Sequence, residues 1–319
     1  MGKIAWLFPG QGAQSVGMCK DVLAASAPAR LVLAAADDAL GEALSRTIAE
    51  GPEETLTLTA NTQPAIVAVS CAMLAAVRER SPALPLPAFG AGHSLGEYSS
   101  LVAAGALSLT DAVRIVRARG SAMQAAVPAG IGAMAAVMGL DPAKVDEICR
   151  EASLGEVVSP ANFNAPGQIV IAGHAAAVAR ASELVVAAKG KAIALKVSAP
   201  FHCALMAPAA RVVEAELAKV TVSAPTFPIV ANVDAEPNVD PARVKQLLVQ
   251  QVDGAVRWEE SIALMQRAGV THALELGPGK VLAGLVRRIA RDIKVLSVCD
   301  LAALDQVEAF VASASAAPE

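Results

Sequence analysis

The residues with the clearest chemical potential are Gly92, Ser94 and Gly96, which form a Gly-x-Ser-x-Gly motif between an apolar run and a helical pattern. A serine on a tight turn from strand to helix points out of the sheet edge, and the flanking glycines let the backbone segments approach closely. The following helix directs its N-terminal amides toward an anion that forms beside the serine. This setting favours nucleophilic catalysis by Ser94 over an ordinary turn.

A serine nucleophile needs a base, and histidine is the usual base near neutral pH. The chain has four histidines. His93 neighbours Ser94, so its side chain diverges and suits a structural or oxyanion-side role, whereas His174 begins a helix and is expected at the surface or at a cap. His202 follows the middle segment of the chain and is placed to face Ser94 across a cleft, although a lone histidine among apolar residues is more often a core residue.

The elements that must position these residues belong to a large folded chain. The 319 residues are 55% hydrophobic and 18% charged, so they can bury a substantial core in one large domain or two. The formal net charge of −4 and the absence of a basic stripe with interleaved aromatic residues argue against nucleic acid as a partner.

Membrane insertion is also disfavoured by the sequence. The apolar stretch at residues 64–77 is too short to span a bilayer, and glycines with Pro128 interrupt the stretch at 121–140. The first apolar run, residues 4–8, is shorter than the core of a secretory signal. Five scattered cysteines without a Cys-x-x-Cys pair indicate reduced, buried thiols and a cytoplasmic protein, with neither a disulfide framework nor a zinc site.

Short apolar runs alternate with helical patterns, which predicts a parallel sheet wrapped by helices. The expected strands are residues 4–8, 88–92, 229–233, 272–276 and 295–298. The expected helices are residues 63–80, 95–104, 110–126, 241–252, 258–268 and 279–290.

The middle of the chain interrupts this alternation. Residues 131–137, 141–152, 156–162, 168–172, 175–189 and 191–197 follow a β-α-β-β-α-β order. This order is typical of a ferredoxin-like unit. We therefore expect a subdomain at 128–197 inserted into a core made of 1–127 and 198–319, with a ligand cleft between the two.

Several further motifs accompany the serine motif in a fixed order. They are FPGQGAQ at 8–14, GHSLG at 92–96, RIVRARG at 114–120, NFNAPGQ at 162–168, APFH at 199–202, and the segment 251–258. Over nearly its whole length the chain resembles the malonyl-CoA:acyl carrier protein transacylases. The resemblance implies an α/β-hydrolase-like parallel-sheet core with an inserted ferredoxin-like subdomain.

The resemblance also implies roles for individual residues. Ser94 would be the nucleophile and His202 its general base, with the backbone carbonyl of Gln251 orienting the imidazole. The backbone amides of Gln11 and Leu95 would form the oxyanion hole.

A second group would contact the substrate. Arg119 would hold a malonyl carboxylate through two parallel hydrogen bonds, and Phe201 would crowd an α-methyl branch and so favour malonyl over methylmalonyl. Some members of the family carry serine at the position of Phe201. Gln11, Asn162 and His93 are also expected on the substrate side of the pocket.

The reaction implied is ping-pong transfer of a malonyl group from malonyl-CoA to the phosphopantetheine thiol of an acyl carrier protein. The pathway would be fatty acid or polyketide synthesis. We expect the chain to be monomeric and to need no metal or redox cofactor. The carrier protein should be acidic, so a basic patch is expected at Lys189 and Lys191 or at Arg287, Arg288 and Arg291.

Two other functions remain open from the sequence. One is a serine esterase or thioesterase that uses Ser94, Asp253 and His272 in the chain order of the α/β-hydrolases. The other is a non-catalytic subunit that retains the fold and docks a carrier protein.

Overall fold

The computed structural model describes residues 2–128 and 130–315, so residues 1, 129 and 316–319 of the predicted domains lie outside the described part of the chain. A six-stranded sheet has the order β10-β9-β1-β2-β7-β8. All neighbouring pairs are parallel except β7 and β8. The strands are β1 (Lys3–Phe8), β2 (Phe89–Gly92), β7 (Ile229–Val230), β8 (Pro237–Asn238), β9 (Val270–Leu276) and β10 (Lys294–Val298).

Strand β1 shows why the sheet is covered on both faces. Five consecutive residues of β1 are buried, because successive side chains point to opposite sides and each side meets a core. Ile4, Trp6 and Phe8 pack into the larger hydrophobic cluster, and Ala5 and Leu7 pack into a second cluster on the other face. The sheet therefore lies between two layers of apolar side chains, as parallel sheets require.

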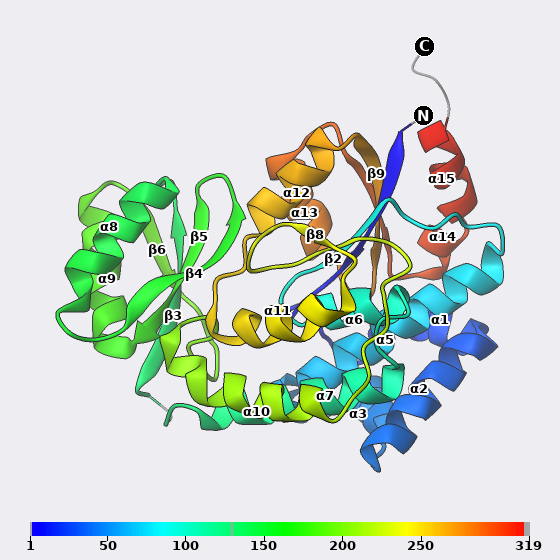
Figure 1. Cartoon of the computed structure of the whole chain (residues 1–319), viewed down its shortest axis with the longest axis horizontal. Helices are drawn as coiled ribbons and strands as arrows, with labels where there is room; N and C mark the ends of the chain where they lie inside the picture. Colours follow the sequence, from blue (N-terminus) through cyan, green and yellow to red (C-terminus); the bar gives the residue numbers. More distant parts are fainter. Residues whose placement is uncertain (1, 129, 316–319) are drawn as a thin grey trace.

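Helices cover both faces of this sheet (Figure 1). On one side lie α5 and α6, and α12 and α13 contact β9 and β10 on the other. The helices of the core are α1 (Lys20–Ala25), α2 (Ala27–Leu40), α3 (Leu44–Glu50), α4 (Glu53–Thr57), α5 (Thr59–Arg80), α6 (Gly96–Ala103), α7 (Leu109–Ala125), α10 (Ala207–Ala218), α11 (Pro241–Asp253), α12 (Trp258–Arg267), α13 (Val281–Ile289), α14 (Leu301–Leu304) and α15 (Val307–Ser315), with a 3₁₀ turn at Ala204–Met206.

Helix α5 is the central helix of the core. Within the described residues it is the one helix long and apolar enough to cross a membrane by length and composition, and 83% of its most apolar window is buried inside the protein. It packs against α2 and α7. Pro64 lies inside the helix rather than at its start, so the predicted beginning at residue 63 was wrong by four residues, because α5 begins at Thr59.

The middle of the chain forms a second, antiparallel sheet at one end of the molecule (Figure 1). Its order is β4-β5-β3-β6, and every neighbouring pair is antiparallel. Its own hydrophobic cluster joins strand residues such as Val137 and Ile171 to helix residues such as Val145 and Val178. The elements are β3 (Gly132–Met138), α8 (Pro142–Ser153), β4 (Val158–Ala165), β5 (Gln168–His174), α9 (Ala175–Ala187) and β6 (Lys191–Ala194). The predicted fold class, a parallel-sheet core with a ferredoxin-like insert, is confirmed.

The predicted strand at 229–233 was too long, because the ladder with β2 ends at Val230. The chain then turns through Ala235, whose φ is 55°, and returns as the antiparallel strand β8. This short hairpin has no extended apolar alternation, which is the signal that predicts strands. The turn places Asn232 just beyond the carboxyl end of β7, at the edge of the sheet where parallel strands carry their ligand sites.

Candidate active site

The nucleophile elbow connects β2 to α6, and Ser94 near its tip has a φ of 52°, in the left-handed region. A Cβ added to Gly92 would lie 1.9 Å from the main-chain carbonyl of Gly96, and one added to Gly96 would lie 2.2 Å from the carbonyl oxygen of Phe8. Only glycine fits at both positions. The main-chain N–H of Ser94 donates to Oδ1 of Asn232 at 2.7 Å, which supports this strained turn.

Ser94 is paired with His202. The serine Oγ lies 2.7 Å from the imidazole Nε2. The opposite nitrogen, Nδ1, lies 2.8 Å from the backbone carbonyl of Gln251 and 3.2 Å from that of Gly254. Because a carbonyl can only accept, Nδ1 carries the proton and Nε2 is free to accept the serine proton. Burial lowers the pKa of His202 to about 3, and the charge of Arg119 adds to this effect, so the imidazole is neutral at neutral pH.

Arg119 extends from α7 into the same site and is only 1% exposed. Its Nη1 donates to Oε1 of Gln63 at 2.8 Å. Its Nη2 donates to Oε1 of Gln251 at 2.9 Å and to Oγ of Ser94 at 3.1 Å. Nε is buried and has no partner within the described chain. A guanidinium in this position offers directed donors to an anion bound beside Ser94.

These groups open into a cavity of about 140 Å³ at the junction of the core and the insert. The core contributes the serine, the histidine and the arginine, and the insert contributes Met134, Asn162 and Leu195. The lining residues are Gln11, Gln63, His93, Ser94, Arg119, Met123, Met134, Asn162, Leu195, Val197, Phe201 and His202. The predicted cleft between the two units is therefore present, and it is lined mainly by side chains predicted from the sequence.

The loop after β1 lies against the elbow. A Cβ on Gly10 would come within 2.4 Å of the carbonyl oxygen of His93, so the loop passes directly beside the turn. The main-chain N–H groups of Gln11 and Leu95 have no hydrogen-bond partner within residues 2–128 and 130–315. Free amides beside Ser94 suit the stabilisation of a tetrahedral oxyanion, the role predicted for this pair.

The other predicted pocket residues also reach the site. Phe201 is 9% exposed and Asn162 is 7% exposed, and both line the cavity. Nε2 of His93 lies 2.8 Å from Oδ1 of Asn164, and its ring packs 5.6 Å from that of Trp258. These contacts hold the imidazole of His93, which also lines the cavity, and its structural or oxyanion-side role stays a prediction.

Two histidines lie away from this pocket. Nε2 of His272 lies 3.1 Å from Oγ of Ser313, and its ring packs 5.0 Å from that of Phe310. The esterase alternative requires His272 to contact Ser94, and the structure does not bring these two side chains together. His174 is at the N-cap position of α9, but its side chain makes no capping hydrogen bond. Its Nδ1 instead accepts from the main-chain N–H of Val157 at 2.9 Å, so the expected capping by this side chain was wrong.

Sequence reasoning missed three polar residues of this site. Gln63 and Asn232 contact Arg119 and Ser94 directly, and Glu97 lies behind them with 2% exposure. Gln63 was detectable as an amide at the predicted start of an apolar helix, where Asn61 is the other amide. Asn232 lies inside the strand predicted at 229–233, and Glu97 directly follows the serine motif, so no local signal singled out either residue.

Cys203 follows the general-base candidate and is 1% exposed. Its Sγ donates to the carbonyl oxygen of Pro200 at 3.1 Å, and burial raises its pKa to about 11. All five cysteines are free. Among the residues that the structure covers, there is no group of three His, Cys, Asp or Glu side chains placed to hold a metal ion.

A serine paired with a neutral histidine at a strand-to-helix elbow, with free amides and a buried arginine around it, is an arrangement suited to acyl transfer. The model of a family described as "acyl transferase domain" matches residues 5–312.

Curated relatives make this class more specific. The malonyl CoA-acyl carrier protein transacylase of Salmonella typhimurium is 47% identical over 305 residues, which cover 95% of this chain and 98% of that protein. The protein of the same name from Bacillus subtilis is 46% identical over 94% of each chain. The chain belongs to the acyl transferase family and, within it, to the malonyl CoA-acyl carrier protein transacylases.

Solved structures agree with this membership. An acyl carrier protein S-malonyltransferase from Vibrio cholerae superposes with a TM-score of 0.92 at 45% identity, covering 96% of this chain and 99% of that one. A malonyl-transacylase in complex with its type II PKS acyl-carrier protein superposes with a TM-score of 0.91 at 42% identity, covering 95% and 98%.

Proposed function

We propose that this protein transfers the malonyl group from malonyl-CoA to the phosphopantetheine thiol of an acyl carrier protein through a malonyl-Ser94 intermediate. The observation that carries the proposal is the meeting of the Ser94 hydroxyl, the His202 imidazole and the Arg119 guanidinium in one pocket. The names of the relatives, and the carrier-protein complex among the similar structures, support the same donor and acceptor.

In the first half-reaction, Nε2 of His202 takes the proton of Ser94 as Oγ attacks the thioester carbonyl. The amides of Gln11 and Leu95 stabilise the oxyanion, the C–S bond breaks, and the imidazolium returns the proton to the coenzyme A sulfur. In the second half-reaction, His202 takes the proton of the carrier thiol, whose sulfur attacks the malonyl-Ser94 ester. The bond from the acyl carbon to Oγ then breaks, and the imidazolium returns the proton to Oγ of Ser94. One thioester is exchanged for another, so these steps balance without a redox reagent or a metal.

Arg119 accounts for the choice of a carboxylated acyl group. Its guanidinium already points toward Oγ of Ser94, so a malonyl carboxylate can receive its hydrogen bonds while the thioester carbonyl lies over the serine. An acetyl group leaves the guanidinium without that partner, which costs roughly 1.5 to 3 kcal/mol for a charged hydrogen bond. The ring of Phe201 fills the pocket wall and disfavours an α-methyl branch.

We further propose that residues 1–127 and 198–319 form the catalytic core and residues 128–197 a subdomain, a division supported by the separate hydrophobic cluster of the insert. A cytoplasmic monomer is the form that we propose for the active protein. Free cysteines suit a reducing compartment, and every group invoked in the mechanism belongs to one chain.

The test is capture of the acyl-enzyme. Incubation with malonyl-CoA should add one malonyl group to Ser94, detected by mass spectrometry of the intact and digested protein, and a phosphopantetheinylated carrier protein should remove it. Ser94→Ala should carry no adduct. His202→Ala should acylate roughly 10²- to 10⁴-fold more slowly, the usual contribution of a general base.

His272→Ala is the matched control and should acylate like the wild type, because His272 packs on Phe310 outside the pocket. Loss of acylation in His272→Ala with retention in His202→Ala would instead support the esterase alternative. A panel of fatty acid and polyketide carrier proteins would then identify the pathway, and no transfer to any of them would refute the proposed acceptor.

A further inference from the structure

Glu97 contacts the active-site network from behind without reaching the cavity. It is the second residue of α6 and is 2% exposed. Its Oε2 accepts two hydrogen bonds, from the main-chain N–H of Asn232 at 2.9 Å and from Nε2 of Gln251 at 2.9 Å. Burial raises its pKa to about 7. A buried carboxylate is costly unless it is well hydrogen-bonded, so its retention here calls for a role.

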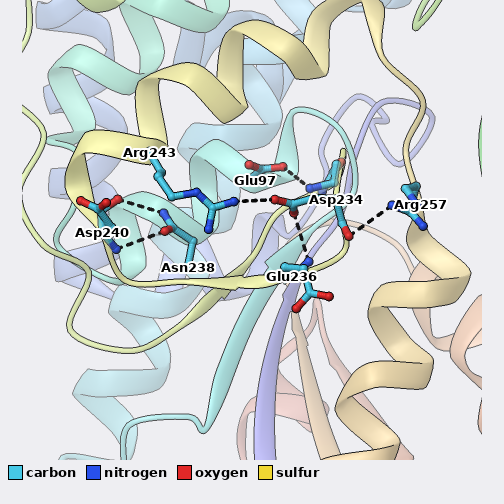
Figure 2. A network of polar contacts seen from close by, with 8 residues as sticks. Glu97, Asp234, Glu236, Asn238, Asp240, Arg243 and Arg257 are labelled. Carbon is cyan, nitrogen blue, oxygen red and sulfur yellow. Dashed lines mark hydrogen bonds and ion pairs between the residues drawn. The ribbon is translucent and has the colours of Figure 1, made fainter.

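The loop that holds Glu97 on one side is itself fixed (Figure 2). Arg243 forms an ion pair with Asp234 at 2.9 Å, and Arg257 donates to the carbonyl oxygen of Asp234 at 3.3 Å. The main-chain N–H of Glu236 donates to Asp234 Oδ1 at 3.1 Å. Because this loop is tied at several points, the N–H of Asn232 is a stable anchor for the carboxylate of Glu97.

On its other side, Glu97 determines which way the side-chain amide of Gln251 faces. That amide is fully buried, and its Nε2 donates both to Glu97 and to the carbonyl oxygen of Ser94, at 2.9 Å each. Two acceptors on one side require the NH₂ group there. Oε1 must therefore face Arg119, from whose Nη2 it accepts at 2.9 Å.

The amide of Gln251 thus stands between Glu97 and Arg119, and the guanidinium of Arg119 has no direct carboxylate partner among the residues that the structure covers. The side chains that accept from its guanidinium are those of Gln63, Gln251 and Ser94, all neutral. A carboxylate in direct contact would compete with the acyl carboxylate for the same donors. The amide of Gln251 instead orients the guanidinium and leaves a donor directed at the Ser94 hydroxyl, where the substrate binds.

We propose that Glu97 is a positioning residue for acyl-group selection: by orienting the amide of Gln251, it holds the Arg119 guanidinium in place for the carboxylate of the substrate. This inference rests on the proposed malonyl transfer. The role depends on an acceptor oxygen at position 97, so a glutamine there should replace the carboxylate. A purely structural role would affect all acyl substrates equally.

The experiment compares acylation of the full chain by malonyl-CoA and by acetyl-CoA. In Glu97→Met, kcat/KM for malonyl-CoA should fall roughly 10- to 100-fold, the effect of misplacing one charged hydrogen bond. For acetyl-CoA it should change by less than about twofold, the usual scatter for uncoupled sites. Glu97→Gln should restore the malonyl rate to within the same margin, and Glu97→Met should cause no further loss in an Arg119→Ala background.

Equal losses for both acyl-CoAs, or an unchanged malonyl rate, would overturn the positioning role. If Glu97→Met does not fold, Glu97→Asp serves instead, because its shorter side chain cannot reach both donors. If folded Glu97→Asp kept the wild-type ratio of kcat/KM for malonyl-CoA to that for acetyl-CoA, the positioning role would also be contradicted. Failure of the proposed function is distinct, since the wild-type protein itself would then form no malonyl-Ser94.

Discussion

The surroundings of His202 strongly alter the acid–base chemistry of its imidazole. Desolvation and the neighbouring charge of Arg119 both disfavour the imidazolium. The hydrogen bonds to the carbonyls of Gln251 and Gly254 favour the imidazolium, but they offset only part of this effect. The net result is an imidazole that stays unprotonated far below the ordinary pKa of histidine. This state is the one that a general base needs, and the protein holds it without a carboxylate beside Nδ1.

The pH dependence of acylation follows from this shift. Lowering the pH protonates His202 and stops catalysis only near its folded-state pKa of about 3, so kcat/KM for malonyl-CoA should change little between pH 7.5 and 5.5. An unperturbed histidine would lose about tenfold at one unit below its pKa. Stopped-flow acylation over this range measures the difference. In Arg119→Met the acid limb should move to higher pH, and a limb near 6.5 in the wild type would contradict the assignment.

At the scale of the secondary-structure elements, β1 and α6 meet closely beside Ser94. Gly96 faces main-chain oxygens of Phe8 and Pro9, which cannot rotate away as a side chain can. Gly96→Ala should therefore displace the start of α6, destabilise the protein by roughly 1 to 3 kcal/mol and slow acylation. Urea unfolding and acylation rates test both effects.

Gly284→Ala is the matched control for this substitution. Gly284 lies inside α13, and a Cβ there would meet no atom within 4 Å. Alanine should stabilise that helix by roughly 0.5 to 1 kcal/mol. If Gly96→Ala proved as harmless as Gly284→Ala, close packing would not be what aims Ser94.

The sequence was sufficient for elements with strong local signals and for side chains carried by motifs. The parallel core sheet, the element order of the insert, and the meeting of Ser94 with His202 and Arg119 agree with expectation. Asn232 was not predictable, because it follows a strand of only two ladder residues and acts through a contact 138 positions away. Nor was Glu97, since hydrogen bonds that cross between α6 and α11 leave no periodic pattern in either segment.

At the scale of the whole molecule, the insert forms one wall of the pocket, and its edge strand β6 leads directly to the lining residues Leu195 and Val197. Lys189 and Lys191, from the predicted basic patch, are exposed at the start of this strand. Arg288 of the alternative patch is engaged with the insert, donating to Gln168 and to the carbonyl oxygen of Pro166. Arg287 and Arg291 are exposed as well, so both predicted patches stay candidates, and the lysine patch is the one nearer in sequence to the pocket lining.

The double variant Lys189→Glu/Lys191→Glu should lower kcat/KM for the carrier protein and weaken its salt dependence, because rim charges act mainly on association. The rate of malonyl-CoA acylation should remain at its wild-type value. Lys219→Gln removes an exposed charge at the C-cap of α10, where Lys219 pairs with Glu216; it is the control and should alter neither step. Unchanged carrier kinetics in the double variant would exclude this edge as the docking site.

The enclosed cysteines have a consequence for how the acyl group travels. Cys203 lies one residue from the base that activates thiols, yet its sulfur stays protonated and engaged with Pro200, and burial also raises the pKa of Cys71 to about 12. We therefore expect a malonyl ester on Ser94 not to migrate to either of these two sulfurs. Cys299 is free and half-buried, so a reagent that alkylates the carrier's thiol can reach it, but Cys71 and Cys203 should stay unmodified. A malonyl-enzyme left without an acceptor could then be isolated and later discharged by adding fresh carrier.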